Sequence, residues 1–211
     1  SVEPEAFCGS FNMLLLRAEV VGPVNLVVVR LNSNRLPMEV LVKPYNPSWA
    51  VAFDSASELV MNAMGFNAIE ACHIGSTAIP NIWAKPIIDM MITVTNIDTV
   101  DTCNQAMAKL GYEAKGEFGI PARRYFRKDD KSGKRTHQIH IFPPDSDHVQ
   151  RHLAFRDFMN AHPKWAIRYS DLKRGLAAKH PHSIADYIAG KDAFIKHVDT
   201  IAAKWRRKTT G

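Results

Sequence analysis

The sequence has few cysteines and no long apolar segment. Its three cysteines, Cys8, Cys72 and Cys103, are widely spaced and form no C-x-x-C pair, which argues against a disulfide framework and fits a reducing compartment. Charged or polar residues interrupt each apolar run near the N-terminus, so no window of about 20 apolar residues could cross a membrane. The first residues are acidic, whereas a secretory signal starts with basic ones. We therefore expect a cytoplasmic protein with no membrane partner.

The motifs of the commonest nucleotide and metal sites are also missing. The sequence contains no Walker loop, no G-x-G-x-x-G fingerprint and no H-E-x-x-H pair. It has no internal repeat and no low-complexity segment either. Any nucleotide or metal site must therefore be built from other residues.

The composition is that of an ordinary globular chain. Of its 211 residues, 46% are hydrophobic and 23% are charged, which fits one domain or one domain with an appendage. The net charge is +6, and because basic and acidic residues balance within residues 1–37, the excess lies in residues 38–211. That excess favours anionic partners such as nucleotides, phosphates or nucleic acid, but a charge that serves solubility alone explains it equally well.

The first 37 residues differ from the rest of the chain. Two short β-branched runs are separated by Gly22-Pro23 and end in the turn-rich "NSNRLP", after which Met38 opens a plausible compact domain. We therefore predict a domain over residues 38–211. One hypothesis is that residues 1–37 are an N-terminal extension, either a non-native leader or an upstream segment that is dispensable for folding.

From residue 38 the pattern alternates between short strands and helices. Apolar residues at helical spacing predict helices, and β-branched runs between polar turns predict strands. The predicted strands are Glu39–Val42, Ala68–Ile74, Ile87–Val94 and a hairpin within residues 122–142. The predicted helices are Ser48–Met64, Asp98–Leu110 and a region over residues 148–208 that Pro163 and Pro181 divide into three. The expected fold class is α/β (α+β), with a mixed sheet of about four or five strands, flanking helices and a C-terminal helical region.

A Gly-Ser turn follows the predicted strand Ala68–Ile74. Glycine lets the backbone turn sharply and approach a ligand, and Ser76 adds a hydroxyl beside exposed backbone N–H groups. Together, Gly75 and Ser76 suit a phosphate group. Gly-Ser turns are also common where no ligand binds, and taken alone the turn is more often structural.

Asp89 interrupts the apolar strand that comes next. An unpaired carboxylate in a buried strand is costly, so Asp89 must face a cleft, a cation or a hydrogen-bond donor. Ligation of a divalent cation is one use. Acceptance of N–H bonds from a nearby turn is the other, and the position of Asp89 alone does not choose between them.

The Gly-Ser turn and the acid on the next strand together resemble the nucleotidyltransferase superfamily, with twelve residues between Ser76 and Asp89. Five successive blocks resemble more closely the GrpB family, a branch of that superfamily. They run in order from about Val40 to Ile201: "HIGSTAIPNIWAKPIIDMMI", "GEFGIPARRYFRK", "THQIHIF", "HLAFRDFMNAHP" and "YIAGKDAFI". The resemblance implies a nucleotidyltransferase-like fold.

The chain departs from these patterns at three places. The wider superfamily usually has a second acid two residues after the first, on the same face of the strand, where this sequence has Met91. The GrpB pattern commonly has an apolar residue there too. Asn81-Ile82-Trp83 stands where the family often has Gly-Leu-Ala, which would reshape the mouth of a pocket, and Gln138 stands where a histidine is frequent.

The predicted hairpin offers further polar residues. Period-2 alternation places Gln138 and His140 on one face and His137 on the other, so the two histidines are not an H-x-H metal pair. A loop centred near residues 131–132 would place His140 opposite Arg123, with an imidazole and a guanidinium on one face. A solvated, charge-rich hairpin is the alternative reading of its basic residues, Arg123, Arg124, Arg127 and Lys128.

The family resemblance implies a role for each candidate. A nucleoside triphosphate would bind with Mg²⁺, and its nucleotidyl group would pass to an unknown acceptor walled by the helices of residues 148–208. Asp89 would be the metal ligand and a catalytic residue, with His140 as a further ligand or general base. The residues expected to contact phosphate are Gly75, Ser76, Thr77, Lys85, Arg123, Arg124 and Lys191.

Two other functions stay open. A non-catalytic module that binds a nucleotide or a coenzyme is favoured by Met91, and relatives of the family occur fused to coenzyme A biosynthetic enzymes. Nucleic-acid binding is weaker, because the basic residues are interleaved with aromatic ones only in "RRYFRK".

Overall fold

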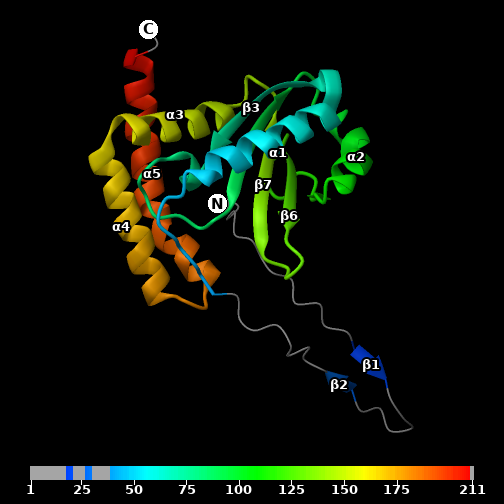
Figure 1. The fold of residues 1–211 in the computed structure, drawn as a ribbon, viewed down its shortest axis with the longest axis horizontal. Helices are drawn as coiled ribbons and strands as arrows, with labels where there is room; N and C mark the ends of the chain where they lie inside the picture. The colour runs from blue at the N-terminus through cyan, green and yellow to red at the C-terminus, as the bar shows by residue number, and fades with distance from the viewer. Residues whose placement is uncertain (1–17, 21–26, 30–38, 210–211) are drawn as a thin grey trace, which may run out of the picture.

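The computed structural model describes residues 18–20, 27–29 and 39–209 (Figure 1). Strands β1 (Ala18–Val20) and β2 (Val27–Val29) pair antiparallel with each other, Ala18 opposite Val29. Most of the proposed N-terminal extension lies outside the described residues, so its hypothesis stays a prediction.

A five-stranded mixed sheet forms the centre of the remaining chain. Its strands are β3 (Ala68–Ile74), β4 (Ile88–Val94), β5 (Glu113–Ala114), β6 (Arg124–Asp129) and β7 (Arg135–Phe142). Their spatial order is β3-β4-β7-β6-β5, with β4 and β7 parallel and the other neighbours antiparallel. Strand β4 therefore has a neighbour on both sides, which agrees with its nearly continuous apolar sequence.

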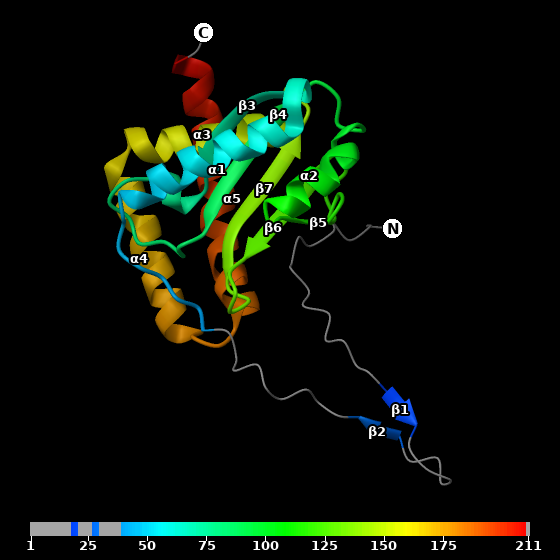
Figure 2. The same cartoon turned by 45° about the vertical axis from the view of Figure 1, so that its right-hand side comes forward.

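Helices α1 (Ser48–Met64) and α2 (Asn104–Lys109) cover one face of this sheet, as Figure 2 shows. Successive side chains of a strand point to opposite faces. Met90 and Ile92 of β4 accordingly join the core formed with these two helices, which also includes Val60 and Met107. Met91 points the other way, into a cluster with Val149.

Three helices follow the sheet: α3 (Asp147–Ala161), α4 (Pro163–Lys179) and α5 (Ile184–Thr209). They gather on one side of the molecule (Figure 1) and share a core of their own, which includes Phe158, Tyr169 and Val198. The predicted divisions at Pro163 and Pro181 are confirmed. Pro163 occupies the first turn of α4, where its missing N–H has no helical partner to lose.

The predicted fold class is thus confirmed: a mixed sheet with flanking helices and a C-terminal helical region. Helix Ser48–Met64 has its predicted bounds, and Gly65 ends it with φ +59°. Within the described part of the chain, no helix is long and apolar enough to cross a membrane.

The predicted strand Glu39–Val42 is wrong. Residues 39–42 form no strand, and only the next residue, Lys43, makes an isolated bridge, with Ala84. Val40 is buried against Ala177 and Tyr187 instead, and its N–H donates to the carbonyl of Pro181 at 2.7 Å. The β-branched residues here serve packing against the C-terminal helices, because tertiary burial overrides a local preference for strand.

The predicted helix Asp98–Leu110 is shorter than expected. A 3₁₀ turn over Val100–Cys103 precedes α2, which begins at Asn104. Thr99 and Thr102 donate their hydroxyls to carbonyls three residues earlier, at 3.0 Å and 2.7 Å. Such local side-chain bonds compete with helix formation.

The predicted hairpin is present, but its register differs from the expectation. His140 lies opposite Tyr125, and Arg123 lies before β6 begins, so the expected pairing of His140 with Arg123 is wrong by two residues. An irregularity at Lys128/Asp129 shifts the register. The assignment of faces is confirmed, because the ring of His140 contacts Tyr125 whereas His137 contacts Tyr112 on the other side.

Candidate functional site

Gly75 and Asp89 form the centre of the candidate site. Antiparallel pairing places Ile74, the last residue of β3, opposite Asp89 in β4. Gly75 then turns the chain with φ +70°, and a Cβ at this position would lie 2.9 Å from the Cβ of Asp89 and closer still to its Oδ2. Only glycine fits both the backbone conformation and the space. The backbone of the turn and the carboxylate are therefore in direct contact.

The Asp89 carboxylate lies among cationic side chains. Burial raises its pKa to about 6, and the positive charges of Lys85, Lys191 and Arg135 act against that rise. Among the described residues no direct ion pair joins Asp89 to any of the three. Asp89 is therefore a partly buried carboxylate on which several positive charges act.

Two of these cations, Lys85 and Lys191, come from different elements and lie near the same aromatic ring, that of Tyr187. The amine of Lys191, on α5, lies 4.5 Å from the centroid of the Tyr187 ring, and that of Lys85, just before β4, lies 5.9 Å from it. Burial lowers the pKa of Lys191 to about 8, helped by repulsion from Lys85. Lys85 and Lys191, which were each expected to contact phosphate, are therefore brought together beside Asp89.

A second tyrosine and lysine, which the sequence analysis did not single out, complete this cluster. Burial raises the pKa of Tyr169 to about 12, and the nearby Ser76 side chain acts against that rise. The amine of Lys173 lies 4.4 Å from the centroid of the Tyr169 ring. A repeated spacing could have revealed both residues, because "YSDLK" in α4 and "YIAGK" in α5 each place a lysine four residues after a tyrosine.

The side chain of Thr77 stabilises the Gly75–Ser76 turn through two hydrogen bonds. Its hydroxyl donates to the carbonyl of Ile87 at 3.1 Å and is hydrogen-bonded to Nε2 of His73 at 3.0 Å. The His73 ring stacks on Phe53 of α1 with 4.7 Å between centroids. His73 therefore packs under the turn, and the Thr77 hydroxyl ties the turn to the loop before β4.

Arg123 and Arg124 are not brought to Asp89. Arg124 bonds Asp101 at 2.9 Å, on the α2 side of the sheet. Arg123 is buried and donates to the carbonyls of Glu117 and Phe118 at 3.1 Å and 2.6 Å. In this structure both guanidinium groups secure neighbouring chain segments. Arg135, from the start of β7, supplies the guanidinium whose charge acts on Asp89.

His140 lies one pleat beyond the Asp89 cluster. Register pairs Asp89 with Gln138 and Met91 with His140. Burial, together with Arg123 and Arg151, lowers the pKa of His140 to about 3, so its imidazole is neutral at physiological pH. Its Nδ1 is buried and has no hydrogen-bond partner in the described part of the chain. The charges that act on it are not those that act on Asp89.

The residues of the cluster fit a metal ion only in part. Across residues 39–209 and the two short described strands, no three His, Cys, Asp or Glu side chains gather in a way that could hold a metal. Asp89 offers one carboxylate, and the amines around it would repel a bare cation. Mg²⁺ commonly binds through one or two carboxylates plus the phosphates of a substrate. Any Mg²⁺ bound by Asp89 would therefore need further ligands from a bound molecule, such as the oxygens of a polyphosphate.

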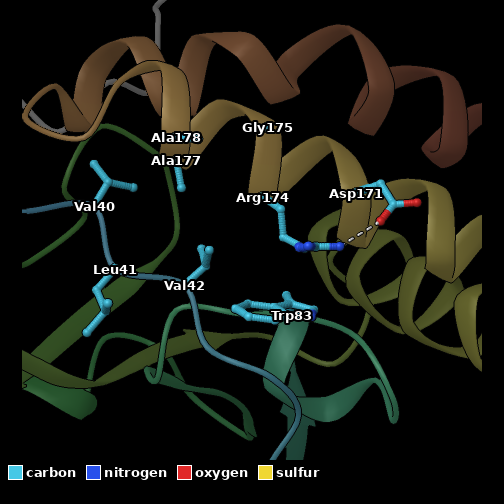
Figure 3. A pocket seen from close by; sticks show the side chains of 9 residues that line it. All are labelled: Val40, Leu41, Val42, Trp83, Asp171, Arg174, Gly175, Ala177 and Ala178. Atoms are coloured by element: carbon cyan, nitrogen blue, oxygen red, sulfur yellow. Dashed lines mark hydrogen bonds and ion pairs between the residues drawn. The ribbon is translucent and has the colours of Figure 1, made fainter.

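A groove opens between α4, residues 40–42 and the loop that carries Trp83 (Figure 3). It has a volume of about 630 Å³. Arg174 lies over the ring of Trp83 at 4.9 Å, and the backbone N–H of Trp83 donates to the Ser170 hydroxyl at 2.8 Å. Its lining residues are Val40, Leu41, Val42, Trp83, Asp171, Arg174, Gly175, Ala177 and Ala178. A cation over an indole offers a flat, partly apolar surface on which a planar ligand could stack.

Known proteins resemble this chain over most of the described domain. The sequence profile described as "GrpB protein" matches residues 39–200. "UPF0157 protein YqkA" of Bacillus subtilis is 46% identical over 163 residues, which are 77% of this chain and 47% of YqkA. The chain thus spans about half the length of that relative. The crystal structure of "conserved protein GrpB from Enterococcus faecalis" has 40% identity and a TM-score of 0.75, covering 79% of this chain and 99% of that one.

Two more distant similarities concern named enzymes. "Dephospho-CoA kinase" of Mycolicibacterium paratuberculosis is 25% identical over 79% of this chain and 46% of its own length. A structure of the Cid1 poly(U) polymerase bound to MgATP aligns with 62% of this chain and 45% of its own, with 11% identity and a TM-score of 0.44. The second similarity is too slight to carry a conclusion.

Proposed function

This chain belongs to the GrpB family, and we propose that it binds a nucleoside triphosphate with Mg²⁺ at the Gly75–Asp89 site and transfers a nucleotidyl group to an acceptor. The observation that carries the proposal is the contact between the Gly75 turn and Asp89, surrounded by lysine amines. A turn without a side chain, a carboxylate and several cations together match the phosphate chain of a nucleotide and the Mg²⁺ that accompanies it.

The residues of the site would divide the work as follows. The Gly75–Ser76 turn would hold the terminal phosphates through backbone N–H groups and the Ser76 hydroxyl. Asp89 would supply one oxygen ligand to the Mg²⁺ that arrives with the nucleotide, and this ion would neutralise charge on the phosphates. Lys85 and Lys191 would stabilise the charge that develops on the phosphoryl oxygens during transfer.

The groove beside α4 is the proposed place for the acceptor. It is lined by the C-terminal helical region and by Trp83, one of the residues expected to shape a pocket mouth. The loop that carries Trp83 also carries Lys85 towards Asp89. An acceptor stacked on Trp83 would therefore contact the loop that also carries Lys85.

A second candidate function is binding without turnover. It is favoured by Met91, which is 1% exposed and packs in a core cluster, so this face of β4 offers no second acid beside Asp89. A relative named for dephospho-CoA kinase suits a coenzyme or nucleotide ligand in such an accessory role. A small-molecule nucleotide is the proposed partner in both cases.

One experiment separates the two functions. The protein is incubated with each of the four triphosphates, Mg²⁺ or Mn²⁺ and a pool of metabolites, while pyrophosphate release and thermal stabilisation are followed. Asp89→Asn tests the site, and Asp145→Asn, which changes an exposed acid, is the matched control. Release that is lost in Asp89→Asn and kept in the control supports transfer. Stabilisation without release supports the binding module, and the absence of both responses rejects both functions.

A further inference from the structure

Helices α4 and α5 present the same pair of residues to each other. Tyr169 and Lys173 lie four residues apart on α4, and Tyr187 and Lys191 lie four apart on α5. In each pair the lysine amine lies over the tyrosine ring, at 4.4 Å on α4 and 4.5 Å on α5. The charge of Lys191 acts on Lys173. Two like charges are thus held near each other inside the protein, where such repulsion is unfavourable.

Lys173 is the more unusual of the two lysines. Its side chain is 1% exposed, and within the described residues its amine has no hydrogen-bond partner. Burial lowers its pKa to about 7. An ammonium offers three donors, and a buried donor without an acceptor is costly. The ring of Tyr169 offsets only part of that cost, because a cation over a ring replaces no hydrogen bond.

Lys173 is also linked to the Gly75–Ser76 turn, through the side chain of Tyr169. Tyr169, whose ring lies under the Lys173 amine, is near enough to Ser76 and Asp89 for both side chains to shift its pKa. The Tyr169 side chain therefore stands between the Gly75–Ser76 turn and Lys173. The long, flexible stem of a lysine can carry its amine from a ring to a nearby acceptor.

The charges of the cluster indicate which chemical group could accept a hydrogen bond from the Lys173 amine. The positive charges of Lys85, Lys191 and Arg135 act on a single carboxylate, that of Asp89, and the charge of Lys191 also acts on Lys173. A ligand that completes this cluster must bring more than one negative charge, and it must offer oxygens both to the Gly75–Ser76 turn and to the Lys173 amine. Linked phosphate groups have both properties.

We propose that Lys173, assisted by Lys191, binds a second phosphate group of the ligand, next to the one held by the Gly75–Ser76 turn. The site is then selective for compounds with at least two linked phosphates, and a single phosphate occupies the turn alone. This inference rests on the proposed function, since it assumes that the turn binds phosphate.

The test uses Lys173→Met in the full chain, which keeps the length and apolar stem of the side chain and removes the amine. Lys179→Met, an exposed position near the end of the same helix, is the matched control. Binding of inorganic phosphate, inorganic tripolyphosphate and each of the four nucleoside triphosphates, ATP among them, with Mg²⁺ is measured by calorimetry. Thermal unfolding without ligand is measured in parallel. If Lys173→Met does not fold, Lys173→Gln takes its place.

We expect Lys173→Met to weaken tripolyphosphate and ATP binding roughly tenfold to hundredfold, the range for one charge-assisted hydrogen bond, and to leave phosphate binding unchanged. Without ligand it should unfold at a higher temperature than the wild type, because a buried amine with no partner has been removed. Lys179→Met should change neither property.

The outcomes separate this inference from the proposed function. Equal tripolyphosphate binding by the wild type and Lys173→Met, or a lower unfolding temperature of the unliganded variant, overturns the inference and leaves the proposed function to the Asp89→Asn test. Binding of tripolyphosphate that depends on Lys173, with no binding of any nucleotide, keeps the inference and rejects the proposed function. If the wild type binds none of these compounds, both are rejected.

Discussion

Gly75 and Asp89 lie so close that the absent side chain of one creates the space for the carboxylate of the other. The antiparallel register of β3 and β4 causes this contact, since it sets Ile74 opposite Asp89 and brings the next residue over the acid. The positive φ of Gly75 then directs the turn across the carboxylate. Two features that are separate in the sequence thus form one unit.

Replacement of Gly75 by alanine should damage this unit. Gly75→Ala has to adopt a φ of +70° and displace Asp89, whereas Gly116→Ala, at φ +59°, has open space around its Cβ. We expect the control to lose about 1 kcal/mol of unfolding free energy from backbone strain alone. Gly75→Ala should lose at least about 2 kcal/mol, together with nucleotide-induced stabilisation. Urea unfolding of both variants measures these changes in unfolding free energy. Equal losses would show that Asp89 moves away from the added methyl group at little cost.

The raised pKa of Asp89 makes stability depend on pH. The folded pKa is about 6, compared with an ordinary value of 3.8, so the folded state binds the proton more tightly. The resulting stabilisation is fully present below about pH 4 and is lost as the pH rises through 6. The unfolding free energy of the wild type minus that of Asp89→Asn should therefore fall across this window, by no more than about 1.4 kcal/mol per pH unit. Urea titrations at each pH measure it, and a flat difference contradicts the assigned shift.

A second acid at position 91 should not create a metal site. Met91 is 1% exposed and packs with Val149, Ile74 and Phe142, so Met91→Asp buries a carboxylate among apolar groups. We expect a loss of roughly 3 kcal/mol or more in unfolding free energy, with no gain in pyrophosphate release. Met91→Leu, which keeps volume and polarity, should cost less than about 1.5 kcal/mol. A stable and more active Met91→Asp protein would mean that this strand face opens to the site.

Gly190 lets α5 approach α4 next to Lys191. A Cβ at this position would press on Leu176, lying 3.0 Å from its Cδ1, whereas a Cβ at Gly175 of α4 would meet nothing within 4 Å. Gly175→Ala should therefore stabilise the protein by about 0.5–1 kcal/mol through helix propensity. Gly190→Ala should lose that gain and about 1 kcal/mol besides, and should weaken nucleotide binding by shifting Lys191. Denaturation curves of both variants measure the difference in unfolding free energy between them. Equal stabilities would mean that the Leu176 side chain rotates away from the added methyl group.

Local patterns in the sequence predicted the parts of the site that local structure controls. The Gly75–Ser76 turn, the strand that carries Asp89 and the helix that carries Lys191 depend on periodicity and turn residues within short segments. The same patterns located α1 and the two proline divisions. The sequence patterns could not define the register of the hairpin. An irregularity at Lys128/Asp129 shifts the pairing of the two strands, and the alternation of polar and apolar residues does not reveal it.

Contacts between distant segments explain what the sequence did not reveal. Arg123 and Arg124 look like phosphate ligands by charge alone, but residues 117–118 and Asp101 use their guanidinium groups. Lys173 looks like an ordinary helix lysine until the packing of α4 against α5 buries it. Charge type can be read from a sequence, whereas the partner of a charge is a property of the assembled fold.

The position of Lys191 on the last helix has a consequence for the order of folding. The cluster joins segments from Ser76 to Lys191, so its loops close over long stretches of chain, and such closures come late. During synthesis the strands that carry Gly75 and Asp89 can pair well before α5 leaves the ribosome. A phosphate ligand that needs Lys191 would therefore bind only the fully folded domain and would stabilise it against unfolding. Ligand binding would then be a measure of the fraction of chains that have completed folding.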